Sequence, residues 1–486
     1  MSLGKKAISG SLLLLFGKVI QKSLGIISML VLARFLTPED FGIVAIATIA
    51  AFFFDTIGQT GTQQYIIQKE TITSQDVNTA WTLNLLFKAG CFLLFIAAIP
   101  FITDYSDNTL LKPVLYWISL IIPLGALISP GLIVQSRNLN YRPITKLTIT
   151  EKFVSICITI PLAVITQNYW AMIIGMISSY FFKLIISYVV APYPVRLCFE
   201  NIREQWKFSK WVLGQAIVGF SRSEADSLLT TRLFGVETLG GFNLMKNIST
   251  LPATEIIRPM TNPLLPAFSK LKNEPKRLAY QFTNCLIVVM ITSSIIVGYI
   301  HFFHATLVQL AFDEKWWRFS PLLGILSLII ISFSISEIAS RLLLSKGLSK
   351  ATFVYSVITL AALLITLLCF DYGSILEFAK ARIAVAYLST LVLVLYAFYL
   401  LKSSPFFFSI SSIFAFSFAY TSGYITTAIV SNLAPPIFVE FLVSGITFVT
   451  VYLILLSLSI LLTWKIPAVK DLALYLFSFY TDARNK

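Results

Sequence analysis

The sequence predicts an all-α protein that crosses a membrane many times. Hydrophobic residues make up 57% of the 486 residues and charged residues only 12%, whereas soluble domains carry about 25% charged residues. Apolar runs such as "TFVYSVITLAALLITLLCF" recur along the whole chain. Each is long enough to cross a hydrocarbon core of about 30 Å as a helix. The runs are continuous rather than alternating, which argues against a transmembrane β-barrel.

The apolar runs predict about fourteen transmembrane helices joined by short connections. We expect spans near 11–33, 43–66, 80–102, 114–135, 148–166, 169–191, 209–233, 241–265, 279–303, 319–343, 351–369, 375–400, 407–430 and 437–463. No cleavage site follows the first run, so we expect a retained first helix rather than a signal peptide. The short connections leave no room for a sizeable soluble domain.

Lysine and arginine residues mark alternate connections, and this asymmetry predicts the orientation of the helices. One set of connections and both termini carry Lys5, Lys6, Lys69, Arg137, Arg142, Lys146, Arg196, Arg203, Lys207, Lys210, Lys270, Lys272, Lys276, Arg277, Lys346, Lys350, Lys402, Lys465, Lys470, Arg484 and Lys486. The opposite connections carry only Arg34, Lys112, Lys315 and Arg318. Both termini are therefore expected in the cytoplasm. The net charge of +14 fits connections that face anionic lipid, so no nucleic-acid partner is predicted.

A short polar connector occurs twice, as "ARFLTPEDFG" at 33–42 and as "TRLFGVETLG" at 231–240. The identical residues stand 198 positions apart and are Arg34 with Arg232, Glu39 with Glu237, and Gly42 with Gly240. The copies follow the first and the seventh expected span, so the units that they open face the same way. Two parallel repeats around a central cavity are typical of some transporters. We predict lobes of about six helices each, at 1–205 and 206–402, and two additional helices with a cytoplasmic tail at 403–486.

The most informative residues are polar and ionisable groups inside the expected spans, because each is costly in lipid unless it is paired or lines water. They concentrate in the first two spans of each lobe, at helical spacing. The basic ones form a candidate substrate-binding set, Lys18, Lys22, Arg222, Lys246 and Arg258. Candidates for lining the cavity or coupling to an ion are Asp55, Gln59, Gln63, Asp226 and Glu255. An excess of cationic side chains suits a pyrophosphate or an acidic sugar.

The ionisable residues inside the expected spans can also be explained by structural roles that involve no ligand. Lys18 lies near a span end, from which its ammonium group can reach the cytoplasmic surface. Arg222 and Asp226 are spaced to form an ion pair within one helix. The same holds for Glu255 and Arg258.

No catalytic or cofactor site emerges from the sequence. The five cysteines show no paired spacing, which argues against a disulfide framework or a zinc site. No Gly-rich phosphate loop opens a soluble helix, so no ATP site is expected. No cluster of Ser, His and Asp or of metal ligands stands in a loop long enough to build an active site. The sequence thus predicts a transporter rather than an enzyme, with no cofactor.

Five stretches carry a family resemblance. They are "VLARFLTPEDFGIVA" at 31–45, "WTLNLLFKAG" at 81–90, "GGFNLMKNISTLPATEIIRPMTNPLLPAFSKLK" at 240–272, "AFDEKWW" at 311–317 and "LLLSKG" at 342–347. Together they resemble the Wzx-type polysaccharide flippases of the multidrug/oligosaccharidyl-lipid/polysaccharide exporter superfamily, in particular the colanic-acid-exporter-like branch. The resemblance implies alternating access and a central cationic cavity. The matching residues here are Lys22, Arg222, Lys246 and Arg258.

The resemblance also implies the cargo, which is an undecaprenyl-diphosphate-linked oligosaccharide repeat unit of O-antigen, capsule or exopolysaccharide. The implied location is the bacterial inner membrane. The implied partners are the lipid-linked glycan and membrane lipids, with a polysaccharide polymerase and a chain-length regulator as further candidates. One alternative is a cation-coupled exporter of drugs or other small molecules, which would favour an acidic cavity. Another is a membrane glycan polymerase or ligase, which would need a longer external loop than 103–113 or 304–318.

Overall fold

The protein is almost entirely helical. The computed structural model describes residues 3–59, 61–69, 71–433 and 435–463, and within them only the main chain of 3–12, 15 and 207–212. The predicted tail after residue 463 and the side chains of Lys5, Lys6, Lys207 and Lys210 lie outside the described residues. The described residues form helices and no β-strand. The predicted all-α membrane fold is therefore confirmed.

The number of spans differs from the predicted one. Among the described residues, eleven helices are long and apolar enough to cross a membrane, and a pair bent by 56°, Leu111–Ala126 with Gly131–Arg137, raises the number to twelve. The predicted count of about fourteen is not confirmed. The difference lies at the seventh and eighth expected spans, which fall largely on α10 (Ile202–Pro252). This helix carries Arg222, Glu224 and Asp226 within five residues. With so many charged residues it is not apolar enough to be included among the eleven helices.

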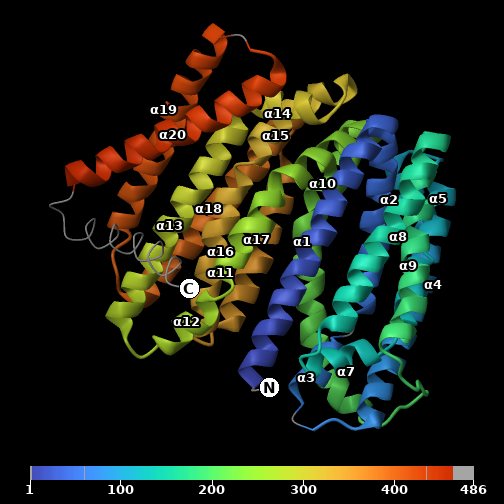
Figure 1. The fold of residues 1–486 in the computed structure, drawn as a ribbon. Coiled ribbons are helices and arrows are strands. Elements are labelled where there is room, and N and C mark those ends of the chain that lie inside the picture. The colour runs from blue at the N-terminus through green and yellow to red at the C-terminus, as the bar shows by residue number, and fades with distance from the viewer. Residues whose placement is uncertain (1–2, 60, 70, 434, 464–486) are drawn as a thin grey trace. The chain divides into compact units, whose positions relative to one another are not determined.

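The chain divides into two compact units, Met1–Asn243 and Leu244–Lys486. Unit 1 contains most of α10 and the helices α1 (Leu3–Phe35), α2 (Pro38–Gly58), α3 (Thr62–Gln68), α4 (Ser74–Ser106), α5 (Leu111–Ile118), α6 (Ile121–Ala126), α7 (Gly131–Arg137), α8 (Arg142–Thr166) and α9 (Trp170–Val190). The helices α1, α8 and α9 lie side by side, and α2 packs on α4 (Figure 1). Their core includes the fully buried side chains of Phe95, Ile118 and Ile173.

Local signals fix where the helices of unit 1 begin. Both α2 and α4 start with a capping box, in which a threonine side chain and an acidic side chain three residues later satisfy each other's backbone N–H groups. The pairs are Thr37 with Asp40 and Thr73 with Asp76. Pro38 follows the first cap at a position where its fixed φ suits a helix start.

Two segments of unit 1 differ from the expected helices. The second expected span, 43–66, is broken, because α2 ends at Gly58 and α3 starts after Gly61, whose φ of 67° is left-handed. The joint "CFENIREQWKFSKW" at 198–211, whose apolar spacing predicts a helix on the membrane surface, is helical only from Ile202, where α10 starts. Trp206 in the first turns of α10 stacks on Phe87 of α4 with ring centroids 4.9 Å apart.

Unit 2 holds the remaining helices. They are a π-helical turn (Ala253–Ile257), α11 (Arg258–Thr261), α12 (Leu264–Lys270), α13 (Pro275–Phe302), α14 (His304–Ala311), a 3-10 turn (Glu314–Phe319), α15 (Ser320–Leu326), α16 (Ile329–Ser345), α17 (Ser349–Cys369), α18 (Ile375–Leu401), α19 (Phe406–Leu433) and α20 (Ile437–Thr463). Helix α13 packs on α16 and α19. The fully buried Phe282, Ile338 and Phe398 lie in the core between the helices. The predicted lobe boundaries at 205 and 402 stay a prediction.

Candidate functional site

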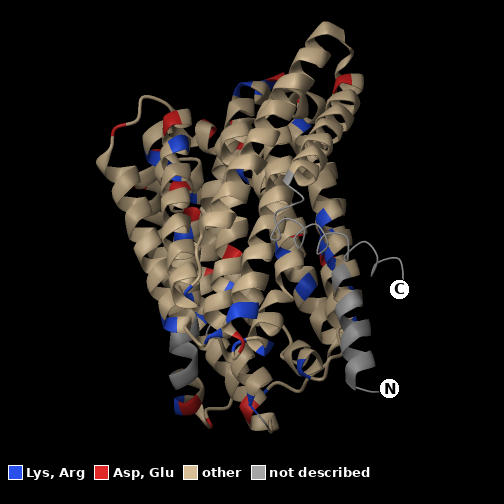
Figure 2. Cartoon of the chain, turned by 90° about the vertical axis from the view of Figure 1, so that its left-hand side faces the viewer, with Lys and Arg blue, Asp and Glu red and all other residues tan. Residues whose placement is uncertain are grey.

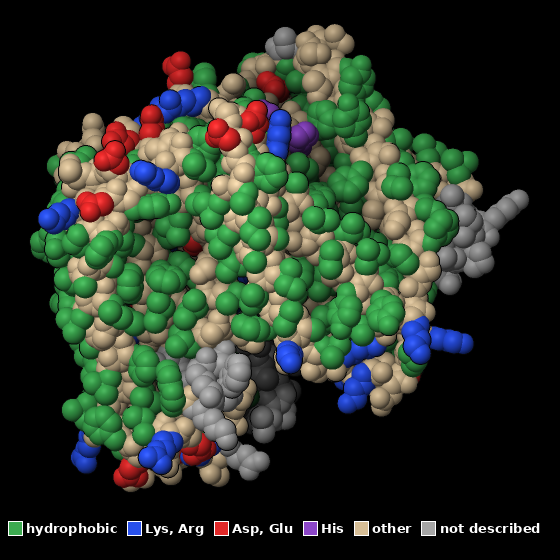
Figure 3. Space-filling model, turned by 180° about the vertical axis from the view of Figure 1, so that it is seen from behind, with side chains coloured by type: hydrophobic (Ala, Val, Ile, Leu, Met, Phe, Trp, Pro, Cys, Tyr) green, Lys and Arg blue, Asp and Glu red, His purple; other side chains and the backbone are tan. Residues whose placement is uncertain are grey.

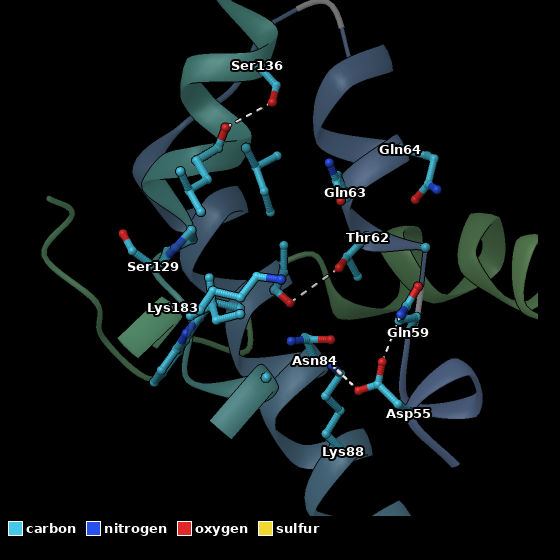
Figure 4. Close-up of a pocket in the computed structure, with 18 of the residues that line it drawn as sticks. Asp55, Gln59, Thr62, Gln63, Gln64, Asn84, Lys88, Ser129, Ser136 and Lys183 are labelled. Atoms are coloured by element: carbon cyan, nitrogen blue, oxygen red, sulfur yellow. Dashed lines mark hydrogen bonds and ion pairs between the residues drawn. The ribbon is translucent and has the colours of Figure 1, made fainter. Parts of the chain in front are cut away.

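A polar cavity of about 470 Å³ lies among the helices of unit 1. Figure 4 shows side chains that face it from α2, α3, α4 and α9. Its polar lining includes Asp55, Gln59, Thr62, Gln63, Gln64, Asn84, Lys88, Ser129, Ser136, Tyr180 and Lys183. Charged residues also stand partway along the helices in Figure 2, where lipid would surround an isolated helix. A polar cavity explains how such residues are tolerated.

The strongest interaction in this cavity joins two buried charges. Lys88 Nζ on α4 donates to Asp55 Oδ1 on α2 at 2.6 Å. The two residues are only 6% and 7% exposed. Gln59 Nε2 donates to the other carboxylate oxygen of Asp55 at 3.0 Å, as the dashed lines in Figure 4 show. Each buried charge is therefore compensated by its partner, and removing either one would leave the other costly.

Two glycines make room for Lys88. A Cβ atom at Gly58 of α2 would lie 2.6 Å from Lys88 Cγ, and one at Gly125 of α6 would lie 3.1 Å from Lys88 Nζ. At Gly58 a side chain would collide with Lys88 close to its backbone, whereas at Gly125 it would press on the flexible ammonium end of the lysine. Gly58 therefore leaves the space that the Lys88 side chain occupies.

A second ion pair lies beside the first. Lys183 Nζ on α9 is 3.1 Å from Glu151 Oε2 on α8, and Ser179 Oγ donates to Glu151 Oε1 at 3.4 Å. Lys183 Nζ also lies 5.3 Å from the centre of the Tyr180 ring. Glu151 lines a neighbouring cavity of about 310 Å³, and Tyr180 lines both cavities. The two cavities therefore meet at Tyr180.

Further hydrogen-bonding groups line the cavity. Trp81 Nε1 is buried and finds no hydrogen-bond partner among the described residues. The described lining includes the side-chain amides of Gln59, Gln63, Gln64 and Asn84 and the hydroxyls of Thr62, Ser129, Ser136 and Tyr180. Amides and hydroxyls both donate and accept hydrogen bonds. Such a lining matches a ligand that carries many hydroxyl groups.

The structure brings three of the predicted site residues into this cavity, namely Asp55, Gln59 and Gln63. These three residues reach the cavity from both sides of the break at Gly61, not from one continuous helix. Lys18 and Lys22 are exposed on α1 and line neither cavity.

The α10 candidates also lie outside the two cavities. Arg222 is half-buried, and no ion pair joins it to Asp226 in the described part of the chain. Asp226 is fully buried, and its Oδ1 accepts the backbone N–H of Ser227 at 2.8 Å. The described residues therefore do not support the alternative in which Arg222 pairs with Asp226.

The remaining candidates belong to unit 2. Lys246 is half-buried, whereas Glu255 and Arg258 are exposed. The Arg258 guanidinium lies 5.2 Å from the centre of the Phe333 ring and forms no ion pair with Glu255 among the described residues. Glu255 Oε1 instead accepts a hydrogen bond from Thr254 at 3.0 Å. The described residues therefore do not support the alternative in which Glu255 pairs with Arg258.

Sequence reasoning missed Lys88 and Lys183, which line this cavity, and Glu151, which pairs with Lys183 from the neighbouring cavity. All three lie inside expected spans, in stretches such as "LNLLFKAGCF" and "SSYFFKLIIS". The rule that selected Asp55 selects them too, since an ionisable residue in an apolar run is costly unless it is paired. They lie in the third, fifth and sixth expected spans, whereas the predicted site residues are concentrated in the first two spans of each lobe.

The helical membrane fold with a polar cavity among its spans defines a polytopic membrane transporter. Residues 31–321 match the family model described as "Polysaccharide biosynthesis protein", and the chain belongs to this family. A relative in Escherichia coli (strain K12), the lipopolysaccharide biosynthesis protein WzxC, is 24% identical over 369 residues, which are 74% of this chain and 73% of the relative. The predicted family resemblance is confirmed.

Solved structures share the fold. The lipid II flippase MurJ in an inward closed conformation matches with a TM-score of 0.74 and 14% identity, over 93% of this chain and 98% of that chain. An inward-facing multidrug resistance transporter of the MATE family matches with a TM-score of 0.60 and 11% identity, over 79% of this chain and 94% of that chain. At these identities the likeness concerns the fold alone.

Proposed function

We propose that the protein is a flippase that moves an undecaprenyl-diphosphate-linked oligosaccharide across the bacterial inner membrane by alternating access. The direction is from the cytoplasmic to the periplasmic leaflet, with both termini in the cytoplasm. Family membership and the flippase fold support this proposal. The diphosphate and the glycan cannot cross hydrocarbon unaided, so the protein must offer them a polar route.

The observation that carries the proposal is the cavity of about 470 Å³ in unit 1, with its amide and hydroxyl lining and an indole N–H of Trp81 that has no partner among the described residues. The lysines in this cavity are neutralised by carboxylates, so the cavity offers hydrogen bonds rather than net positive charge. We assign it to the glycan. Sugar rings could stack on Trp81, and their hydroxyl groups could form hydrogen bonds with the lining. Such contacts would bind glycans of different sugar composition.

Two arginines are the proposed contacts of the diphosphate. Arg222 in unit 1 and Arg258 in unit 2 form no ion pair among the described residues. Arginine is suited to phosphate because its planar guanidinium donates two parallel hydrogen bonds. Lys18, Lys22 and Lys246 are further proposed contacts, and Asp226 is a proposed lining residue.

Coupling to an ion gradient would involve Asp55 or Glu255. Protonation of Asp55 would remove the charge that holds Lys88 at 2.6 Å, so the pair would part and the cavity would gain a free cation. A polysaccharide polymerase and a chain-length regulator are proposed as downstream partners, because the translocated repeat unit must be consumed on the far side.

The test is translocation of a fluorescent undecaprenyl-diphosphate oligosaccharide in liposomes. Wild type should move it, and Arg222→Ala and Arg258→Ala should slow it at least about tenfold, the loss expected for one charge-assisted contact. Arg203→Ala, an exposed arginine at the start of α10, is the matched control and should transport normally. Transport of cationic drugs instead of the lipid would favour the exporter. Extension of the glycan chain without translocation would favour the polymerase.

A further inference from the structure

A second cavity, of about 530 Å³, lies in unit 2 where three helix ends meet. They are the N-terminus of α13, the C-terminus of α18 and the N-terminus of α19. The lining residues are Pro275, Lys276, Ala279, Tyr280, Thr283, Asn284, Leu401, Lys402, Ser403, Ser404 and Phe407. The proposed function makes no use of this cavity.

One face of α13 forms a wall of the cavity. Lys276, Tyr280 and Asn284 follow one another at intervals of four, so they form a stripe along the helix. The N-cap residue Glu274 makes no side-chain capping bond. The first backbone N–H groups of the helix are therefore left without that partner, and the helix end carries partial positive charge.

The charge of the lining is positive. Lys402 ends α18 in a left-handed conformation with φ 50°, and it joins Lys276 in the lining. The described lining contains no acidic residue. Glu274 just outside it is neutralised by Arg277, whose Nη1 lies 3.2 Å from the carboxylate. Two lysines and a helix N-terminus thus act together, which is the combination that binds anions.

Asn284 provides independent evidence of a ligand. Its side chain is only 2% exposed, and its Nδ2 has no hydrogen-bond partner among the described residues. A buried donor without an acceptor is costly. Asn284 lines the cavity two turns below Lys276, so an oxygen of a bound anion could accept its hydrogen bond. The lining offers further donors in Tyr280 and Ser403.

We propose that this cavity binds a phosphate group, and that its source is the headgroup of an anionic phospholipid. Exposed apolar residues stand close in sequence to the lining residues Leu401 and Phe407, with Tyr399 78% and Phe406 69% exposed, so acyl chains could lie alongside. Figure 3 shows lysine and arginine side chains gathered at the lower edge of the hydrophobic surface on the right-hand side. Basic residues at the border of a hydrophobic surface are where anionic headgroups bind.

The experiment uses the full chain, purified in detergent with equal amounts of phosphatidylglycerol and phosphatidylcholine, and counts retained lipids by native mass spectrometry. Wild type should retain phosphatidylglycerol selectively. The double variant Lys276→Gln/Lys402→Gln should lose that retention at least about fivefold. The matched control Lys272→Gln/Lys350→Gln removes two exposed lysines outside the lining and should retain the lipid. Equal loss in both double variants would overturn the proposal.

Asn284→Leu tests the unpartnered donor. If Asn284 serves the ligand, the variant loses retention about fivefold although its thermal stability is equal to or above that of wild type. Unchanged retention would overturn its assigned role. In a separate arm, inorganic phosphate is added to wild type in phosphatidylcholine alone. A rise in melting temperature that depends on Lys276 and Lys402, without selective lipid retention, would keep the phosphate site and overturn its lipid source. If neither the rise in melting temperature nor the selective lipid retention is observed, both the phosphate site and its lipid source are overturned.

Discussion

Gly240 packs directly against Gly42. A Cβ atom on Gly240 would lie 2.8 Å from the backbone nitrogen of Gly42 and would overlap the carbonyl oxygen of Pro38. The contact is reciprocal, because a Cβ atom on Gly42 would overlap the carbonyl oxygen of Val236. These glycines occupy the same position in the two copies of the repeated connector. The two copies of the connector thus touch each other, backbone to backbone.

Gly240→Ala should destabilise the protein by about 1–3 kcal/mol, because the new methyl group must push two backbones apart. Gly219→Ala is the matched control on the same helix, since a Cβ atom there meets nothing within 4 Å. It should leave stability unchanged or raise it slightly. Thermal unfolding of both variants in detergent measures the difference. Equal melting temperatures would show that the glycine contact can relax at no cost.

The Asp55–Lys88 pair gives a sharper energetic test. Lys88→Met should cost about 3–5 kcal/mol, since it leaves the Asp55 carboxylate buried without a counter-charge. The double variant Asp55→Asn/Lys88→Met should recover a large part of that loss, because no isolated charge remains. The free energy of unfolding is measured by chemical unfolding for wild type, Asp55→Asn, Lys88→Met and the double variant, which completes a double-mutant cycle. Additive losses would mean that the two side chains do not stabilise each other.

Trp81→Phe separates binding from folding. The change keeps an aromatic ring and removes an indole N–H that has no partner among the described residues, so stability should stay within about 0.5 kcal/mol. Translocation of the lipid-linked oligosaccharide should fall about fivefold, the value of one hydrogen bond to the glycan. Trp117→Phe is the control, because Trp117 is exposed on α5 and lies outside the cavity. Normal transport by Trp81→Phe would remove Trp81 from the proposed glycan contacts.

The sequence predicts the helices better than it predicts the site. Hydropathy places helices well because each span must satisfy its own backbone in lipid. It does not register a left-handed residue such as Gly61, which breaks the second expected span. Contacts between side chains on different helices are still harder to predict from the sequence. Helical spacing predicts pairs within one helix, yet Asp55 pairs with Lys88 of α4, 33 residues away, and no ion pair between Arg222 and Asp226 is found in the described part of the chain. Only packing decides such contacts.

His304 should make stability depend on pH. Burial lowers the pKa of this histidine, and the nearby His301 lowers it further, while its Nδ1 is buried without a hydrogen-bond partner among the described residues. It stands on α14, outside the apolar spans. Above its ordinary pKa of about 6.5 the side chain is neutral in both the folded and the unfolded chain, so it has no effect on the pH dependence there.

As the pH falls below about 6.5, the unfolded chain takes up a proton that the folded chain still refuses, so the folded state loses stability. The loss should continue until the pH passes below the lowered pKa of the folded state. His304→Gln cannot take up that proton, and its melting temperature should therefore fall less than that of wild type between pH 8 and pH 5. If both proteins lose the same amount over this range, the acid sensitivity arises elsewhere, and His304 is not the group that the folded state keeps neutral.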